Sequence, residues 1–403
     1  MKKTKNDVAN HCVFDEYFLE HDELKTLTER FGTPLFVYDE KGLRQRTKSL
    51  LSYFTACGTM NYFPVEKCPL REILQVLADA GMGALCQSED ELRLALSSGF
   101  PGDRILYAAM ILGESLALEL RRMNSALLAG SELVLRGPLP ARVLLFCRTF
   151  GETKKKHMFS RAMPGIGFDR RELEETIPRL RESGVQSVGI GLRYDGNVTD
   201  EAFLASRLTA CSRFAAELKN VGCPIDHVHL MGGLGIRYRR VDLQTIYYEQ
   251  AFSKLHQAVC AAEHKVSLTL GTLFAEPAGI FAAKVLGVLD RLGALVVLNA
   301  HMEDIALNPA ERYRHISVSG NTVIRDRCCC DVVSEKPALG QWFGKNRLLP
   351  LPAAGDLLVF HDAGCSRPAN SLLPVLMKRQ DGTVTVLQHG EKQQCADADT
   401  KGG

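Results

Sequence analysis

Residues 61–69 read Asn-Tyr-Phe-Pro-Val-Glu-Lys-Cys-Pro, and residues 70–80 continue with a helical pattern that closes at Gly81-Met82-Gly83. The apolar and aromatic residues at the start of this stretch are typical of a short buried strand. The second part has apolar residues three and four positions apart, which predicts an amphipathic helix. A strand that leads directly into a helix is the unit from which parallel sheets are built. The stretch therefore predicts an α/β fold.

The same order of strand and helix recurs through the middle of the chain. Short apolar runs predict strands at residues 104–107, 143–146, 188–192, 227–230 and 266–270. Amphipathic patterns predict helices at residues 41–54, 71–80, 88–98, 170–183, 201–221 and 243–263. Repeated units of this kind imply a parallel sheet with right-handed crossovers, and about eight of them close a barrel. We therefore predict a β/α barrel over residues 34–285.

The pattern changes after about residue 283. Short β-rich runs, broken by Gly, Pro and Asn, predict strands at residues 295–298, 315–318, 357–361 and 384–388. Runs of this kind are typical of an antiparallel β domain, which we place at residues 286–392. The tail at residues 393–403 is polar and ends in Gly-Gly, so we expect it to be disordered.

Composition predicts an ordinary cytoplasmic protein. The 403 residues are 46% hydrophobic and 24% charged, which is enough to bury a large core in two domains. The formal charge of +2 predicts no strong attraction to nucleic acid or to anionic membranes. No stretch reaches the length of a membrane-spanning helix, and the start of the chain has no apolar signal core. The thirteen cysteines include no CxxC pair, so we expect reduced thiols, with neither a metal site nor a disulfide.

Several short motifs follow one another along the chain, at residues 32–39, 231–236, 275–279, 296–302, 345–350, 355–358 and 362–364. Their sequences and their order resemble those of the fold-type III pyridoxal-phosphate (PLP) dependent decarboxylases of diaminopimelate and ornithine. The resemblance implies a PLP-binding (β/α)8 barrel with a C-terminal antiparallel β domain, on which residues 1–33 pack. It also implies PLP as the cofactor and a dimer whose active sites are shared across a two-fold axis.

The residue at the position of the family's Schiff-base lysine decides what chemistry is expected. An ungapped alignment from Gly81 places Glu66 there, and a carboxylate cannot form an imine. Side chains alternate along a strand, so if Glu66 faces the barrel mouth we expect Lys67 to face outward. A one-residue bulge near Pro64 would exchange the two side chains, and Lys67 then becomes the alternative Schiff-base residue.

The resemblance also implies positions for cofactor contacts. Gly232, Gly233 and Gly235 match a phosphate loop, where backbone N–H groups approach an anion, although a tight turn in any α/β barrel explains them equally well. Glu276 matches the glutamate that bonds the pyridine nitrogen. Arg193 stands where the family has the histidine that stacks on the ring, and an arginine near Glu276 in the family's motif is missing here.

The family's Cys-Glu-Ser motif supplies a proton donor across the dimer interface. Matched on its glutamate, the motif reads Ser334-Glu335-Lys336, and serine is a far weaker acid than cysteine. A longer gap brings Cys330 into register instead, so both positions stay open. The other interpretation of the run at residues 328–330 is three small buried residues on a strand.

Two classes of function follow. The first is a non-catalytic homologue that keeps the fold and forms a homodimer, or a heterodimer with an active paralogue, or binds a small-molecule ligand. The second is a working enzyme, either a PLP-dependent decarboxylase of a diaminopimelate-like amino acid that uses Lys67, or one with a different reaction. Concerted loss of functional positions on separate strands favours the first class. A salt bridge between Glu66 and Arg193 across the barrel mouth is one further hypothesis.

Overall fold

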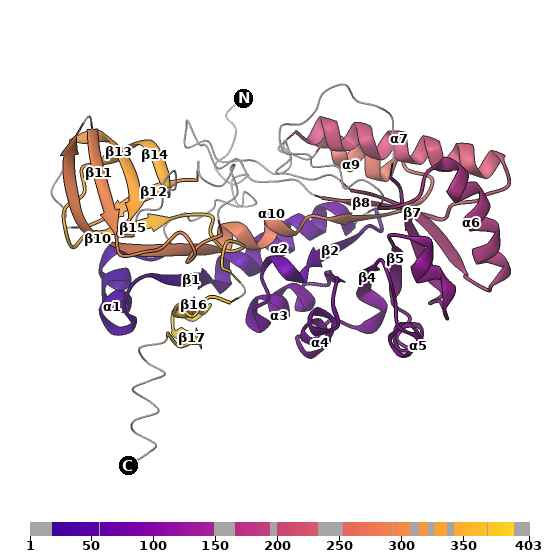
Figure 1. Ribbon diagram of the computed structural model, residues 1–403, viewed down its shortest axis with the longest axis horizontal. Coiled ribbons are helices and arrows are strands. Elements are labelled where there is room, and N and C mark those ends of the chain that lie inside the picture. The colour runs from indigo at the N-terminus through magenta and orange to yellow at the C-terminus, as the bar shows by residue number, and fades with distance from the viewer. Residues whose placement is uncertain are drawn as a thin grey trace, which may run out of the picture. The chain divides into compact units, whose positions relative to one another are not determined.

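The computed structural model (Figure 1) describes most of the chain as two compact units. The described residues are 18–55, 57–148, 166–193, 200–232, 253–291, 293–306, 314–320, 326–336, 342–368 and 370–390. The barrel unit takes its described residues from 46–273, and the β unit takes them from 18–45 and 274–390.

Eight parallel strands close the barrel. They follow one another in chain order around the ring, and the last strand pairs with the first. The strands are β2 Met60–Pro64, β3 Gly83–Cys86, β4 Ile105–Ala109, β5 Ala126–Ala129, β6 Arg142–Phe146, β7 Ser187–Arg193, β8 His227–Met231 and β9 Lys265–Thr269. The predicted fold class is confirmed, because a closed parallel barrel accompanies a separate, mostly antiparallel sheet.

Helices connect the barrel strands (Figure 1). They are η1 Val65–Lys67, α3 Arg71–Asp79, α4 Glu89–Ser97, η2 Gly102–Arg104, α5 Glu114–Arg122, η3 Glu132–Arg136, α6 Arg170–Glu182, α7 Glu201–Asn220 and α9 Ser253–Cys260, and α10 Gly271–Ala275 follows the last barrel strand. Helix α6 begins with a capping box, in which Asp169 and Glu172 each bond the other's backbone N–H. The predicted helix at 243–263 lies partly outside the described residues, and α9 is its described part. Within the described residues, no helix has the length and apolar character needed to cross a membrane.

The barrel interior is apolar at its centre. One cluster joins inward-facing residues from strands around the ring: Tyr62, Leu85, Leu106, Ala126, Leu128 and Leu144, with Met60, Ala108, Phe146 and Met231 packed against it. Strand β7 contributes glycine here because a side chain would not fit. A Cβ atom on Gly191 would lie 2.9 Å from Leu128 Cδ1, and one on Gly189 would lie 2.7 Å from the carbonyl oxygen of His227. Neighbouring side-chain and backbone atoms already occupy the space.

The β unit is built around one long strand, β10 Gly279–Arg291, which pairs antiparallel with β1, β11 and β15. The strand order is β14-β13-β11-β10-β1-β16-β17, and β12 joins through β15. The other elements are α1 His21–Phe31, β1 Leu35–Asp39, η4 Glu276–Ala278, β11 Gly293–Leu298, β12 Ile316–Ser319, β13 Arg327–Ser334, β14 Gly344–Pro350, β15 Leu357–Phe360, β16 Val375–Lys378 and β17 Val384–Gln388. Helix α2, Glu40–Thr55, starts in this unit.

Strand β1 lies in the β unit, although the predicted barrel boundary at residue 34 includes it. It pairs antiparallel with β10 and parallel with β16, and Leu35 and Val37 pack in a core with Leu24 and Leu27 of α1. A strand followed by a helix has the same local pattern in either place. Only the backbone hydrogen bonds, made to residues far along the chain, decide where β1 belongs.

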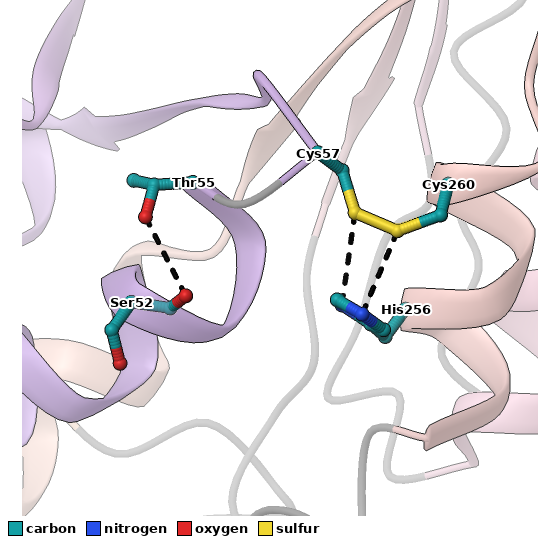
Figure 2. Close-up of a disulfide and its surroundings, with 5 residues drawn as sticks. All are labelled: Ser52, Thr55, Cys57, His256 and Cys260. Atoms are coloured by element: carbon teal, nitrogen blue, oxygen red, sulfur yellow. Dashed lines mark hydrogen bonds between the residues drawn. A yellow bond between two sulfur atoms is a disulfide. The ribbon is translucent and has the colours of Figure 1, made fainter.

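The expectation that the chain contains no disulfide is wrong for one pair. Cys57, just after α2, is bonded to Cys260 at the end of α9, and 203 positions separate them in the sequence (Figure 2). Free thiols are present at Cys86, Cys147, Cys211, Cys223, Cys328, Cys329 and Cys330. No spacing rule predicts a bond between residues so far apart, because the barrel's closure brings β2 and β9 together.

Candidate functional site

The two residues that the sequence predicts for the Schiff-base position lie beyond the strand. Strand β2 ends at Pro64, and Glu66 and Lys67 fall in the short 3-10 helix η1 that follows. Their side chains are 46% and 47% exposed, and Lys67 Nζ lies 3.7 Å from Glu66 Oε1. The expectation that they face opposite sides of a strand is therefore wrong, because alternation applies only to extended backbone. Both side chains are exposed at the carboxyl end of β2.

Acidic and weakly acidic groups surround this end of the barrel. Burial raises the pKa of Glu91, and the charge of Glu66 raises it further, against a lowering by the Gln87 N–H. Burial also raises the pKa of the Cys86 thiol to about 12 and, together with nearby Glu89, raises the pKa of Tyr107. At neutral pH the Cys86 thiol is therefore protonated and a poor nucleophile.

The predicted phosphate loop and ring-stacking position are described in part. Gly232 follows β8 with a φ of 91°, a conformation that glycine adopts at little cost. Gly233 and Gly235 lie outside the described residues. Arg193 ends β7, where its backbone is in register with Met231 of β8; its side chain lies outside the description. Glu66 has Lys67 as a charged partner.

A chain of buried polar side chains joins the neighbouring barrel strands β8 and β9. His227 Nε2 and His229 Nδ1 each lie 2.7 Å from Ser267 Oγ, and His229 Nε2 lies 3.1 Å from Thr269 Oγ1. Two neutral imidazoles can make all of these hydrogen bonds. His229 donates through one ring nitrogen and accepts at the other, and His227 Nε2 either donates to Ser267 Oγ or accepts from it. The rings of His229 and Tyr62 also form a T-shaped pair, with centroids 5.9 Å apart.

These histidines are neutral in the folded protein. Burial, followed by the charges of Arg142 and Lys265, lowers the pKa of His227 to about 4. Burial, followed by His227, lowers the pKa of His229 to about 3. A base in catalysis works best with a pKa near the working pH, so these values point to a structural role for the pair. The pattern His227-x-His229, on a strand that ends just before Gly232, is the feature of the sequence that indicates this pair.

Glu276 is fully buried in an ion pair within the β unit. Its Oε1 atom accepts hydrogen bonds from Arg314 Nη2 at 3.2 Å and from Ser366 Oγ at 3.0 Å. Its Oε2 atom accepts the backbone N–H of Cys365 at 2.6 Å. Arg314 Nη2 also donates to Ser366 Oγ at 2.7 Å, so the three side chains form one closed cluster. Both Glu276 and Arg314 are 0% exposed.

This cluster holds a charge that burial would otherwise make very costly. A carboxylate is tolerated in a protein interior only when a cation and hydrogen-bond donors surround it, as they do here. Arg314 had no signal in the sequence, because it lies 38 positions from Glu276 and outside every matched motif. Glu276 was predicted as a cofactor contact, and the structure gives it protein partners at both oxygens.

The two candidates for the family's cysteine differ in surroundings. Cys330 is 0% exposed on β13, and burial, together with the Cys328 thiol, raises its pKa to about 12. A thiol in that setting favours the packing interpretation. The expectation of three buried cysteines is wrong for Cys329, which is exposed, while Cys328 is half-buried.

Ser334 ends the same strand and lies 3.5 Å from His301 Nδ1, whose Nε2 atom lies 3.8 Å from Glu335 Oε1. A nucleophile and its base need a separation of about 2.6–3.2 Å, so these distances do not describe an activated serine. Ser334 Oγ instead accepts the backbone N–H of Lys336 at 3.0 Å.

Comparison with known proteins agrees over nearly the whole chain. The model of the pyridoxal-dependent decarboxylase family, pyridoxal binding domain, matches residues 41–283. Protein TabA of Pseudomonas amygdali pv. tabaci is 26% identical over 392 residues, covering 91% of each chain. Diaminopimelate decarboxylase of Campylobacter jejuni is 24% identical over 369 residues, covering 85% of this chain and 88% of that protein.

Among solved structures, diaminopimelate decarboxylase from M. jannaschii in complex with L-lysine superposes with a TM-score of 0.78 at 20% identity. The match covers 91% of this chain and 92% of that one, and it supports the fold. The barrel, the mostly antiparallel sheet and a family match over more than half of the chain agree. The chain therefore belongs to the pyridoxal-dependent decarboxylase family.

Proposed function

We propose that this chain is a non-catalytic or functionally redirected member of the family, which does not hold PLP through a lysine imine. The proposal concerns the chemistry of two positions: the end of β2 and the carboxylate of Glu276. It leaves the fold of the family intact, since fold and chemistry are separable.

The observation that carries the proposal is the burial of Glu276. PLP works as an electron sink when a carboxylate bonds its pyridine nitrogen. Glu276, at the position of that carboxylate, is 0% exposed and accepts three hydrogen bonds from protein donors. A guanidinium beside it also disfavours a protonated pyridine, because like charges repel. The described residues therefore do not fit PLP held in the family's manner.

The end of β2 supports the same conclusion. Glu66 occupies the aligned position of the Schiff-base lysine, and a carboxylate forms no imine. A catalytic lysine is usually activated by burial, which lowers its pKa. Lys67 is instead 47% exposed beside the carboxylate of Glu66.

A decarboxylase that uses Lys67 is the second candidate. One observation favours it: Lys67 lies in η1 at the carboxyl end of β2, the end at which barrel enzymes carry their active sites. The side chain is exposed there rather than packed against the outer helices. In this alternative the substrate is a diaminopimelate-like amino acid.

We further propose that the protein assembles as a homodimer or as a heterodimer with an active paralogue. The segment at 345–364 keeps the family's pattern near its dimer interface. In this chain it presents Leu348 and Leu351 with 63% and 41% of their surface exposed, as expected where a partner covers them. Sedimentation of the purified protein as a monomer at micromolar concentration, with no paralogue captured, would contradict this assembly.

The decisive experiment asks whether any lysine forms an imine with PLP. Protein incubated with PLP is reduced with borohydride, and peptide mass spectrometry then locates the modified lysine, while carbon dioxide release is measured with diaminopimelate, lysine, ornithine and arginine. We expect no stoichiometric modification at Lys67 and no turnover. We expect Glu66→Lys to restore cofactor binding at most, because groups that act as a unit are not restored singly.

Matched variants separate the two candidates. Lys219 is an exposed lysine on α7, so Lys219→Ala controls for nonspecific imines. An absorbance band that Lys67→Ala abolishes, and that Glu66→Ala and Lys219→Ala leave, would replace the first candidate with the second. Carbon dioxide release over multiple turnovers by the wild-type protein would also overturn the non-catalytic proposal.

A further inference from the structure

One cluster of metal-binding side chains lies on the barrel unit, separate from the positions discussed above. Cys57, His256 and Cys260 place their ligand atoms within 4.8 Å of one another (Figure 2). His256 Nε2 lies 3.5 Å from Cys260 Sγ, and His256 Nδ1 lies 4.0 Å from Cys57 Sγ. The two sulfurs are joined in the structure, with the imidazole beside both of them.

Two elements build this cluster. His256 and Cys260 are four positions apart on α9, so they project from one face of the helix. Cys57 follows the last turn of α2 and approaches the same face. Cys57 and His256 are half-buried and Cys260 is exposed, so an ion reaches the cluster from solvent.

The set of donors is specific. Two thiolates and one imidazole are ligands that Zn²⁺ prefers, whereas a disulfide by itself needs no histidine. Among the described residues, no other His, Cys, Asp or Glu joins the group. The nearby hydroxyl of Thr55 donates to the carbonyl oxygen of Ser52, away from the sulfurs (Figure 2).

We propose that the reduced protein binds one Zn²⁺ ion through Cys57, His256 and Cys260, and that water completes the tetrahedron. The disulfide and the metal site are then alternative states of the same sulfurs. The sulfurs must separate to about 3.8 Å, the spacing set by tetrahedral Zn–S bonds of about 2.3 Å. Because Cys57 lies in a turn and Cys260 ends a helix, rotation about their side-chain bonds provides this movement.

The chemistry balances with a phosphine as the reductant. The phosphine gives two electrons to the S–S bond and takes the oxygen of one water as phosphine oxide. The two hydrogens of that water become the two thiol protons. Zn²⁺ then replaces these protons, so two protons are released for each ion bound.

The test uses tag-free, full-length protein, reduced with a phosphine and transferred to oxygen-free buffer without reductant. Zn²⁺ is measured by competition with a chromogenic chelator, and Co²⁺ reports the ligands through sulfur charge-transfer and tetrahedral d–d absorption. We expect one ion per chain. Loss of an outer-shell partner alone weakens metal binding by roughly 10–100-fold, so we expect Cys57→Ser, Cys260→Ser and His256→Gln each to weaken it by at least about 100-fold.

Two exchanges serve as matched controls. Cys328→Ser removes a thiol from the other close sulfur pair, whose Sγ atoms are 3.3 Å apart, and His264→Gln removes a histidine just beyond α9. Both should keep one ion per chain. The proposal fails if reduced wild-type protein binds no ion, if binding survives the cysteine exchanges, or if Cys328→Ser abolishes it. Circular dichroism identifies any variant that does not fold. If one of the three ligand exchanges fails to fold, the other two ligand exchanges decide the test.

Discussion

The barrel unit and the β unit each contain a glutamate beside a cation, in opposite environments. Glu276 and Arg314 in the β unit are 0% exposed and both bond the hydroxyl of Ser366, and Glu276 also accepts the backbone N–H of Cys365. Glu66 and Lys67 in the barrel unit are about half exposed, with 3.7 Å between their charged atoms. Separating Glu66 from Lys67 costs little free energy, because water solvates both charges. Removing Arg314 from Glu276 is costly, because it leaves an unpaired charge in the protein interior.

The comparison shows how far the surroundings of a glutamate decide its interactions. Glu276 matches the family's motif, and protein donors bond both of its carboxylate oxygens. The buried polar groups at His227 and His229, in the interior of the barrel, differ from both ion pairs because they are neutral. There, burial keeps His227 and His229 neutral, and hydroxyl groups satisfy them without any charge.

The largest expected effect is the loss of one member of the buried pair. Arg314→Met leaves the carboxylate of Glu276 buried without its cation, and we expect the free energy of unfolding of the β unit to fall by about 3–5 kcal/mol. Urea unfolding followed by fluorescence of Trp342, the chain's one tryptophan, measures this unit.

The double variant Arg314→Met/Glu276→Gln tests the cause. Removing both charges should recover more than half of the lost free energy, because no unpaired buried charge then remains. If the double variant is as unstable as Arg314→Met, packing rather than charge holds this cluster together.

The second effect is a loss of barrel stability in acid. The folded pKa values of His227 and His229 are about 4 and about 3, below the ordinary value of 6.5, so the unfolded chain binds more protons as the pH falls. Stability is complete above pH 6.5 and is lost below it. We expect each histidine to remove roughly 1.5 kcal/mol between about pH 6.5 and 5.

Urea unfolding followed by circular dichroism at several pH values measures this slope. His229→Gln should reduce the slope by about half within this window, which lies above the range where most carboxylates titrate. An unchanged slope would show that His229 is already protonated, or accessible to water, in the folded barrel.

The smallest effect is expected at the exposed pair. Lys67→Ala and Glu66→Ala should each change the free energy of unfolding by less than about 0.5 kcal/mol, because solvent screens the pair. A double-mutant cycle measures their coupling, which we expect to be near zero. A coupling free energy above about 1 kcal/mol between Glu66 and Lys67 would contradict this prediction. The exposed pair and the buried pair of Glu276 and Arg314 would then differ less in interaction energy than their exposure indicates.

Local pattern in the sequence was sufficient for most of the scaffold. The alternation of strands and helices predicted β4, β6, β7, β8 and β9, and the β-rich runs predicted β11, β12, β15 and β17. Periodicity succeeds here because each element buries one face, and that requirement is written in consecutive residues. The end of β2 was predicted too far along the chain, because the strand stops at Pro64 and Val65–Lys67 form a 3-10 helix. The prediction that Lys67 faces outward assumed the alternation of side chains along a strand, so it was wrong.

The sequence by itself determined the family and the barrel. Only the tertiary structure decided that β1 joins the β unit, that Arg314 reaches Glu276, and that Cys57 meets Cys260. Those contacts join residues far apart in the sequence: 38 positions separate Arg314 from Glu276, and 203 separate Cys57 from Cys260. Another contact of this kind is the hydrogen bond that the Tyr38 hydroxyl donates to the carbonyl oxygen of Gly364. Local periodicity carries no information about such partners, because chain closure and packing, rather than neighbouring residues, bring them together.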